Sequence, residues 1–309
     1  MNDQPEQSYR FFGTQEEGIQ GIRVGSFDDA PIGVFDSGFG GLTVAREIMK
    51  ALPNESIIYF GDTLHCPYGP RSFAEVRGFV EAIGTWLVER GVKMIVIACN
   101  TATAAGLSFA QTTFPVPVLG VVEPGARAAA RATRNRRVGV IATKGTVESG
   151  VYTDAIRATD AGITVFSTAT PRFVEIAELG IRMAKGPIEN YTSLASQVYI
   201  RPEFQEIAQD YLDPLRRCDV DTLVLGCTHF PLLKSLIGGV MGHEVVLISS
   251  ASEVARDCSD MLIRQGIAAS KDHEPHYEFF TSGDDIEAFR TFGTRVLRFP
   301  LDNLQHVIL

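Results

Sequence analysis

The sequence lacks the features that would place it outside the ordinary class of globular proteins. Its five cysteines are odd in number and include no CxxC pair, so they form neither a disulfide framework nor a zinc ribbon. Such thiols are typical of a reducing cytoplasm, where we expect the protein to reside. No apolar stretch reaches the length of a membrane-spanning helix, and residues 1–30 lack the charged start and apolar core of a signal peptide. We therefore expect no membrane partner and interpret residues 1–30 as a flexible extension.

The chain also lacks an excess of positive charge. Its formal net charge of −9 argues against a nucleic-acid partner, because a surface that binds phosphates needs concentrated Lys and Arg. A small anionic substrate stays open, since backbone N–H groups can bind anions on an acidic protein. With 309 residues, of which 45% are hydrophobic and 21% charged, the composition is that of one large or two medium-sized globular domains.

Short apolar runs alternate with helical patterns along the chain, which predicts an α/β fold with mostly parallel sheets. The run Ile32–Phe35 with its Gly-rich turn is echoed by Val138–Ile141 and the loop at Thr143, so we interpret the chain as an internal duplication. A longer connection over 181–204 separates the elements of the second half. The other predicted strands are Ile57–Phe60, Met94–Ala98, Val118–Val122 and Val245–Ile248.

This pattern predicts two pseudo-symmetric, doubly wound α/β domains. The first would comprise residues 31–123 and 237–309, and the second residues 124–236. The strand Val245–Ile248 would thus return to the first sheet. Ligands of parallel α/β sheets bind beyond the carboxyl ends of the strands, so we expect the active site in the cleft between the domains.

Two cysteines occupy equivalent places in the two halves. Cys99 and Cys227 each follow an apolar strand and precede a polar cluster that opens a helix. A helix N-terminus lowers the pKa of a thiol, so both are candidate acid/base groups facing one substrate. The alternative is that they are small buried hydrophobes, as most free cysteines are. For Cys66, Cys218 and Cys258, which lack this setting, we favour that alternative.

A Gly-rich turn, Asp36-Ser37-Gly38-Phe39-Gly40-Gly41, joins a predicted strand to a helix. Its N–H groups are suited to a carboxylate or phosphate, although it has neither the dinucleotide-binding GxGxxG spacing nor the P-loop GK[ST]. Asp36 is equally suited to capping the helix. Other polar pairs lie at the same predicted edge, where simple turn or N-cap roles are the alternatives: Tyr68-Gly69, Asn100-Thr101 and Thr228-His229. Cys227-x-His229 without further ligands is a poor zinc signal, so we expect no metal.

Taken together, these motifs resemble the glutamate racemases of the cofactor-independent aspartate/glutamate racemase superfamily. The resemblance rests on five segments in family order: Gly33–Thr43, Pro67–Gly69, Ala98–Ala102, Val121–Ala126 and Gly226–Leu232. A shorter match is Pro171–Val174 with Glu178 beyond it, which is similar to a family segment whose glutamate partners the histidine. The loop with Thr143 and Thr146 also resembles a family contact region.

The resemblance implies which residues act. Cys99 would be the catalytic thiol on the D-enantiomer side and Cys227 the one on the L-enantiomer side, with Asp36, His229 and Glu178 as orienting or relay groups. The implied substrate contacts are Asp36, Ser37, Tyr68, Gly69, Asn100, Thr101, Thr143, Thr146, Thr228 and His229. It further implies L- and D-glutamate as substrates, a D-glutamate supply for peptidoglycan, no cofactor and a homodimer.

Other functions remain open from the residues alone. A racemase of the same superfamily with aspartate or a broader substrate range is the nearest alternative. A cysteine hydrolase using Cys227 with His229 would leave Cys99 without a role, and an amino-acid-binding module would leave both thiols unexplained.

Overall fold

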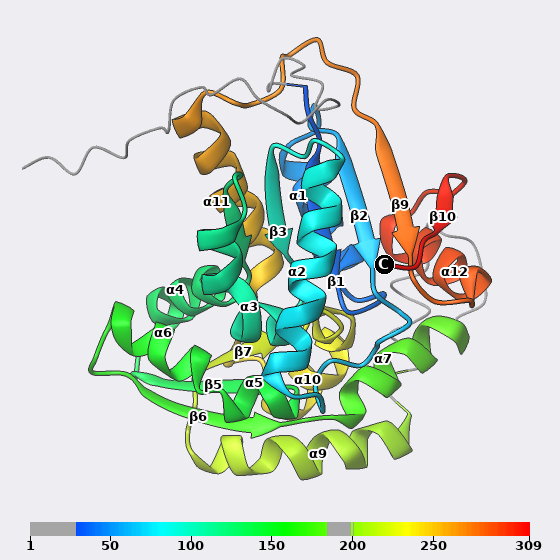
Figure 1. The fold of residues 1–309 in the computed structure, drawn as a ribbon. Helices are drawn as coiled ribbons and strands as arrows, with labels where there is room; N and C mark the ends of the chain where they lie inside the picture. The colour runs from blue at the N-terminus through cyan, green and yellow to red at the C-terminus, as the bar shows by residue number, and fades with distance from the viewer. Residues whose placement is uncertain (1–28, 184–198, 200) are drawn as a thin grey trace, which may run out of the picture.

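Two parallel sheets organise the chain, of which the computed structural model describes residues 29–183, 199 and 201–309. The first sheet has the order β10-β9-β2-β1-β3-β4 and the second β6-β5-β7-β8. Figure 1 shows the first sheet above the second. The strands are β1 Ile32–Asp36, β2 Ile57–Gly61, β3 Met94–Ile97, β4 Val118–Gly120, β5 Arg137–Ala142, β6 Thr164–Ala169, β7 Thr222–Gly226, β8 Val246–Ser249, β9 Tyr277–Thr281 and β10 Leu304–His306.

Helices cover both faces of each sheet. Against the first sheet, α1 packs with α11 on one face and α2 with α3 on the other; in the second, α4 pairs with α6, and α9 with α10. The helices are α1 Leu42–Ala51, α2 Phe73–Glu89, α3 Asn100–Thr113, α4 Val122–Ala132, α5 Lys144–Glu148, α6 Val151–Thr159, α7 Arg172–Met183, α9 Pro202–Arg217, η2 Phe230–Leu233, α10 Lys234–Met241, α11 Ser250–Gln265 and α12 Ile286–Leu297.

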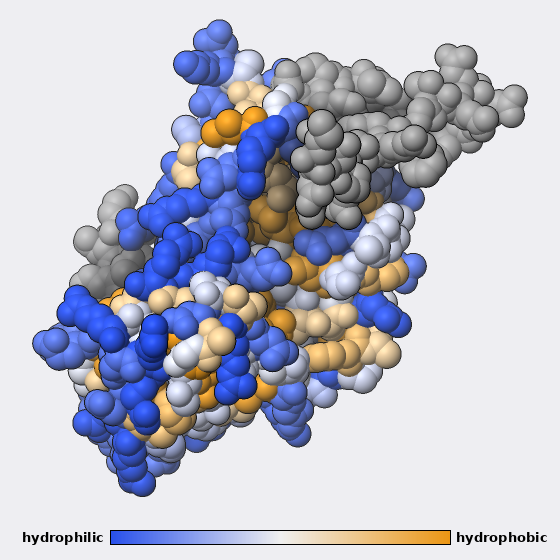
Figure 2. Space-filling model, turned by 90° about the vertical axis from the view of Figure 1, so that its left-hand side faces the viewer, coloured by the Kyte–Doolittle hydropathy of each residue, from blue (hydrophilic) through white to orange (hydrophobic). Residues whose placement is uncertain are grey.

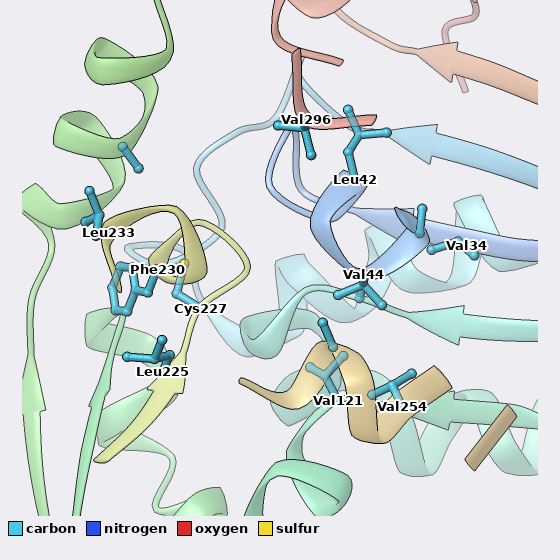
Figure 3. Packing of buried hydrophobic residues seen from close by; sticks show 14 of the residues in the cluster. Val34, Leu42, Val44, Val121, Leu225, Cys227, Phe230, Leu233, Val254 and Val296 are labelled. Carbon is cyan, nitrogen blue, oxygen red and sulfur yellow. The ribbon is translucent and has the colours of Figure 1, made fainter. Parts of the chain in front are cut away.

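Alternation along β1 shows why this strand needs helices on both sides. Val34 packs in the core that contains α1 and α11, whereas the next residue, Phe35, packs in the core that contains α2 and α3. Up to its last residue, Asp36, the strand therefore carries no polar side chain, as is usual for strands of parallel sheets. The first of these cores continues to Cys227 and Phe230 after β7. Figure 3 shows these two side chains together with Leu42 and Val44 of α1, which belong to the same cluster. One apolar core thus joins the two sheets.

The predicted duplication is visible in the strand order. The order β2-β1-β3-β4 of the first sheet recurs as β6-β5-β7-β8 in the second. β3 and β7 hold the same place, so Cys99 and Cys227, which come within two residues of the ends of these strands, are equivalent by position. The α/β class with mostly parallel sheets is confirmed.

One strand lies where the sequence reading did not place it. The strand predicted at Val245–Ile248 was expected in the first sheet, but β8 pairs with β7, with Val246 opposite Thr222 and Ser249 opposite Leu225. The expectation is wrong because β8 is the counterpart of β4 and completes the repeat. A boundary that assigns residues 237–309 to the first domain is therefore wrong for β8, which belongs to the second sheet. The division of the chain into two domains otherwise stays a prediction.

Parts of two expectations cannot be followed in the structure. The predicted flexible extension over 1–30 lies outside the described residues except for its last two positions, and so does most of the 181–204 connection. Among the described residues, no helix combines the length and apolarity needed to cross a membrane. Figure 2 shows one face on which hydrophilic residues predominate, with hydrophobic ones gathered in smaller patches between them.

The end of the first sheet opposite the thiols holds a buried ion pair. The Lys93 ammonium lies 2.6 Å from the Glu55 carboxylate, with both side chains almost fully buried, and Glu55 also accepts a hydrogen bond from the Ala269 N–H. We predict that Lys93→Met lowers the free energy of unfolding by about 3 kcal/mol, because it leaves a buried carboxylate without its cation. Urea denaturation followed by circular dichroism would measure the change.

Lys50→Met is the matched control. Lys50 pairs with Glu47 at 2.9 Å, but its side chain is 60% exposed, so its loss should change stability by less than about 0.5 kcal/mol. Equal effects of the two substitutions would contradict a stabilising role for the buried pair.

Candidate active site

Cys99 and Cys227, one from each sheet, line the same cavity. Cys227 directly follows β7, Cys99 follows β3 after the single residue Ala98, and each is only 6% exposed. The cavity between them has a volume of about 30 Å³. Its walls come from the strand ends and loops of both sheets: Ser37, Cys66, Pro67, Tyr68, Gly69, Cys99, Asn100, Thr101, Thr143, Val174, Cys227, Thr228 and His229. Most residues that the sequence singled out therefore meet at one place.

Cys99 is held at the N-terminus of α3. Its sulfur accepts a hydrogen bond from the Ala102 N–H at 3.4 Å and lies 3.7 Å from the Ser37 hydroxyl. Burial and the nearby Asp36 carboxylate outweigh these contacts and raise the pKa of Cys99 to about 12. The expectation that the helix N-terminus would lower this pKa is wrong for this arrangement, because loss of water around the thiolate is the larger effect.

Asp36 ends β1 and connects the two halves of the molecule. Its carboxylate accepts hydrogen bonds from the N–H groups of Gly38 and Gly41 and so holds the Gly-rich turn. The N-cap of α1 is Gly41, so the capping alternative for Asp36 is wrong. The Thr228 hydroxyl reaches the other carboxylate oxygen at 3.4 Å. Burial raises the pKa of Asp36 against the lowering effect of His229 and these hydrogen bonds.

Close approach of the two loops requires a glycine at position 40. A Cβ atom there would lie 2.3 Å from the Thr228 hydroxyl oxygen and 2.5 Å from Nδ1 of His229. Thr43, at the start of α1, donates to the carbonyl oxygen of Thr228 at 2.9 Å. The Gly-rich turn therefore serves as a docking surface for the segment after Cys227.

His229 bridges Cys227 and Glu178. Its Nδ1 lies 3.8 Å from the Cys227 sulfur, and its Nε2 lies 3.2 Å from a carboxylate oxygen of Glu178 on α7. Burial by itself would lower the pKa of His229. The hydrogen bonds to Cys227 and Glu178 have the larger, opposite effect and raise this pKa to about 10. An imidazolium is thus held between a thiol and a carboxylate, as a proton relay requires.

The hydroxyls of Thr101 and Thr143 at the cavity wall form a cluster with that of Thr146 on α5. The Thr101 hydroxyl lies 3.0 Å from that of Thr143 and 3.2 Å from that of Thr146, and the last two are 3.0 Å apart. Asn100, beside them, accepts a hydrogen bond from the Tyr152 hydroxyl at 2.7 Å. Capping of α3 falls to the Cys99 sulfur, so Asn100 and Thr101 are left to face the cavity.

Sequence reasoning missed some residues at this site. Cys66 lines the cavity although we expected an ordinary buried thiol, and it precedes Pro67 in a cis peptide bond. Asp62, 3% exposed, accepts a hydrogen bond from the cavity residue Tyr68. Its position directly after a strand, like that of Asp36, was the available signal. Nothing in the sequence distinguished Tyr152.

The described residues contain no group of three or more His, Cys, Asp or Glu side chains placed to hold a metal ion. What the site offers instead is a pair of thiols, a relay of His229 and Glu178, and a set of hydroxyl and N–H donors. Proton transfer at a carbon atom between two faces is the chemistry that this set can perform.

Known proteins are similar to this chain in sequence and in fold. A family model described as Asp/Glu/hydantoin racemase matches residues 32–258. The glutamate racemase of Corynebacterium glutamicum is 48% identical over 271 residues, which is 87% of this chain and 92% of that protein. The glutamate racemase of Corynebacterium diphtheriae is 47% identical, over 84% of this chain and 91% of its own length.

Solved structures agree. A glutamate racemase isoform from Bacillus anthracis superposes with a TM-score of 0.80 at 40% identity, covering 91% of this chain and 98% of that one. The glutamate racemase of Francisella tularensis, solved with D-glutamate, gives a TM-score of 0.78 at 32% identity with the same coverage. This chain therefore belongs to the Asp/Glu/hydantoin racemase family and, within it, to the glutamate racemases.

The raised pKa of His229 makes stability depend on pH. Between the ordinary pKa of 6.5 and about 10, the native state holds a proton at His229 that the unfolded chain has lost. The free energy of unfolding should therefore fall as pH rises, by up to about 1.4 kcal/mol per pH unit. We predict that Glu178→Gln makes this slope shallower, because it removes one of the two groups that raise the pKa of His229 and leaves only Cys227 to oppose burial. Urea unfolding between pH 6.5 and about 8.5, below most cysteine titration, would measure it.

Glu175→Gln is the control for this experiment, since Glu175 lies on α7 like Glu178 but is exposed. It should keep the wild-type slope. Identical slopes for wild type and Glu178→Gln would show that the carboxylate does not hold the proton on His229.

Proposed function

We propose that this site interconverts L- and D-glutamate by moving the α-proton between the thiols of Cys99 and Cys227, and so supplies D-glutamate for peptidoglycan synthesis. The observation that carries the proposal is that two strand-end thiols, equivalent by position in the two sheets, line one cavity. Inversion at carbon needs a base on one face and an acid on the other, and a pair of thiols supplies both.

The surroundings of the two thiols differ in a way that suits these roles. Cys99 keeps its proton because burial and Asp36 raise its pKa to about 12, so it is ready to act as the acid. Cys227 lies beside His229, which can donate to its sulfur and pass a proton onward to Glu178. By family resemblance, Cys227 faces the L-enantiomer and Cys99 the D-enantiomer. The roles exchange when the reaction reverses.

The polar walls would bind and stabilise the substrate. Removing the α-proton places charge on the α-carboxylate, and N–H groups at Ser37, Asn100 and Thr228 lie around the cavity where they can stabilise it. The hydroxyls of Thr101, Thr143 and Thr146 offer donors to the second carboxylate. Exclusion of water strengthens each of these interactions.

A contact between Gly69 and helix α5 borders the narrow cavity, whose volume is about 30 Å³. Gly69 and Gly145 close it on one side, where the Gly145 N–H donates to the Gly69 carbonyl at 3.1 Å. Gly69 also borders a second cavity of about 330 Å³ between residues 69–73 and α5. We propose that separation of this contact admits the substrate.

Neither rival function accounts for the cavity. A hydrolase that used Cys227 with His229 would give the Cys99 thiol no task, and a binding module would not need acid/base groups on both walls. No cofactor is required, since thiols and hydrogen-bond donors suffice for the proton transfers. We further propose a cytoplasmic homodimer, in keeping with exposed apolar side chains such as Phe73 and Leu179. Light scattering after size-exclusion chromatography would test the assembly.

Cys99→Ser and Cys227→Ser should each reduce racemisation in both directions by at least about a thousandfold, within the range of a lost acid/base group. A serine hydroxyl is too weak an acid to take either role. Circular dichroism of D- and L-glutamate solutions would follow both directions.

Cys218→Ser provides the control, because Cys218 follows α9 and is not among the cavity residues. It should keep wild-type turnover, as should wild-type protein dialysed against EDTA. Racemisation that survives in either single strand-end variant would contradict the two-thiol mechanism.

We expect the protein to prefer glutamate over aspartate by about a hundredfold or more in kcat/KM. A site that fits the longer side chain loses apolar contact and leaves polar donors unpaired when one methylene is missing. Initial rates with D-glutamate and D-aspartate would measure the preference. Equal or faster turnover of aspartate would favour the aspartate or broad-range alternative.

A further inference from the structure

A second buried carboxylate, Asp62, lies beside the site without a role in the proton transfers. It directly follows β2, and its backbone N–H donates to the carbonyl of Asp36 at 3.0 Å. Its side chain accepts hydrogen bonds from the Tyr68 hydroxyl at 2.5 Å and the Ser282 hydroxyl at 2.6 Å, and Nδ1 of His65 lies 2.9 Å away. A carboxylate 3% exposed is thus surrounded by three donors.

These contacts hold a substrate-facing loop from within. The rings of His65 and Tyr68 both stack on Phe79 of α2, with centroid distances of 4.3 and 5.2 Å. Arg71 donates to the carbonyl of His65 at 2.7 Å. The loop from Asp62 to Gly69 is therefore fixed between the carboxylate on one side and an aromatic stack on the other.

The C-terminal part of the chain supports the same loop. The Leu64 N–H donates to the Ser282 hydroxyl at 3.0 Å, and the hydroxyls of Thr63 and Thr281 lie 2.7 Å apart. The Gly283 N–H donates to Thr63 at 3.0 Å. Asp62 therefore binds both Ser282, which follows β9, and Tyr68 of its own loop.

Tyr68 reaches the cavity with its hydroxyl already committed. Burial and the Asp62 carboxylate raise the pKa of Tyr68, so its proton stays on the hydroxyl and points to Asp62. What the cavity receives from this loop is therefore the tyrosine ring and the backbone of Tyr68 and Gly69. Gly69 fits closely against Thr143, since a Cβ there would lie 3.0 Å from the Cβ of Thr143.

We infer that Asp62 is a positioning residue for glutamate binding: through Tyr68, His65 and Ser282 it sets where the backbone of Tyr68 and Gly69 meets the substrate. This inference rests on the proposed function. Asp62 touches neither the reacting carbon nor the two thiols, so its loss should weaken substrate binding and leave the proton transfers themselves largely intact.

Asp62→Asn tests the assignment, because the amide keeps the size but cannot accept from all three donors. We expect KM for both enantiomers of glutamate to rise about tenfold, corresponding to one disrupted buried network, with kcat within about threefold of wild type. Tyr68→Phe should raise KM as well. The double variant should raise it no more than the larger single change, because both substitutions remove the same interaction.

Glu55→Gln is a matched control, since Glu55 is also 3% exposed and precedes β2, at the opposite end of the strand that Asp62 follows. It should lower the free energy of unfolding and leave KM unchanged. If Asp62→Asn does not fold, Ser282→Ala can replace it in the test, because it removes only one of the donors to Asp62. It should raise KM by a smaller factor than Asp62→Asn. Far-ultraviolet circular dichroism would confirm that each variant is folded.

The outcomes separate the two proposals. Wild-type protein that neither binds nor racemises glutamate would contradict the proposed function. The positioning role alone would be overturned by a different result. In that case the wild type is active, but the Asp62→Asn variant, or Ser282→Ala in its place, loses stability and keeps the wild-type KM. Asp62 would then be a purely structural group like Glu55.

Discussion

The contact between the turn after β1 and the segment after β7 determines the rest of the site. Asp36 and Thr43 both bind Thr228, one through its hydroxyl and the other through its carbonyl oxygen. Gly40 leaves the space that this contact requires. Since the two segments belong to different sheets, these few hydrogen bonds fix the second thiol relative to the first. Without them, equivalent positions in two repeats would not produce one cavity.

Burial has opposite effects on the groups assembled there. It raises the pKa values of Asp36 and Cys99, because loss of water disfavours their negative forms. It would also disfavour a charged His229, but the hydrogen bonds to Cys227 and Glu178 outweigh it. The closed site therefore holds a protonated thiol on one wall and a positively charged relay on the other. That asymmetry is what a reversible acid/base pair needs at any one moment.

Local patterns predicted both thiols and the strands that precede them, because periodicity and strand-end motifs depend on neighbouring residues. They did not predict β6, β9 or β10. The strands predicted at Ile57–Phe60 and Val138–Ile141 agree with β2 and β5 to within one residue at each end. β8 was misplaced because pairing with β7 depends on distant contacts. The pKa of Cys99 could not be foreseen either, since it depends on burial by both sheets. Asp62 was overlooked because its partners, Tyr68 and Ser282, lie far apart in the sequence.

The most direct test of the two-thiol account is proton NMR of D-glutamate incubated with the protein in deuterated buffer. If one thiol removes the α-proton and the other delivers a solvent-derived deuteron, the first L-glutamate formed should carry deuterium at Cα. The remaining D-glutamate should still carry protium at that stage. Early L-glutamate that retains the original proton would show that a single group serves both faces, and would contradict the account.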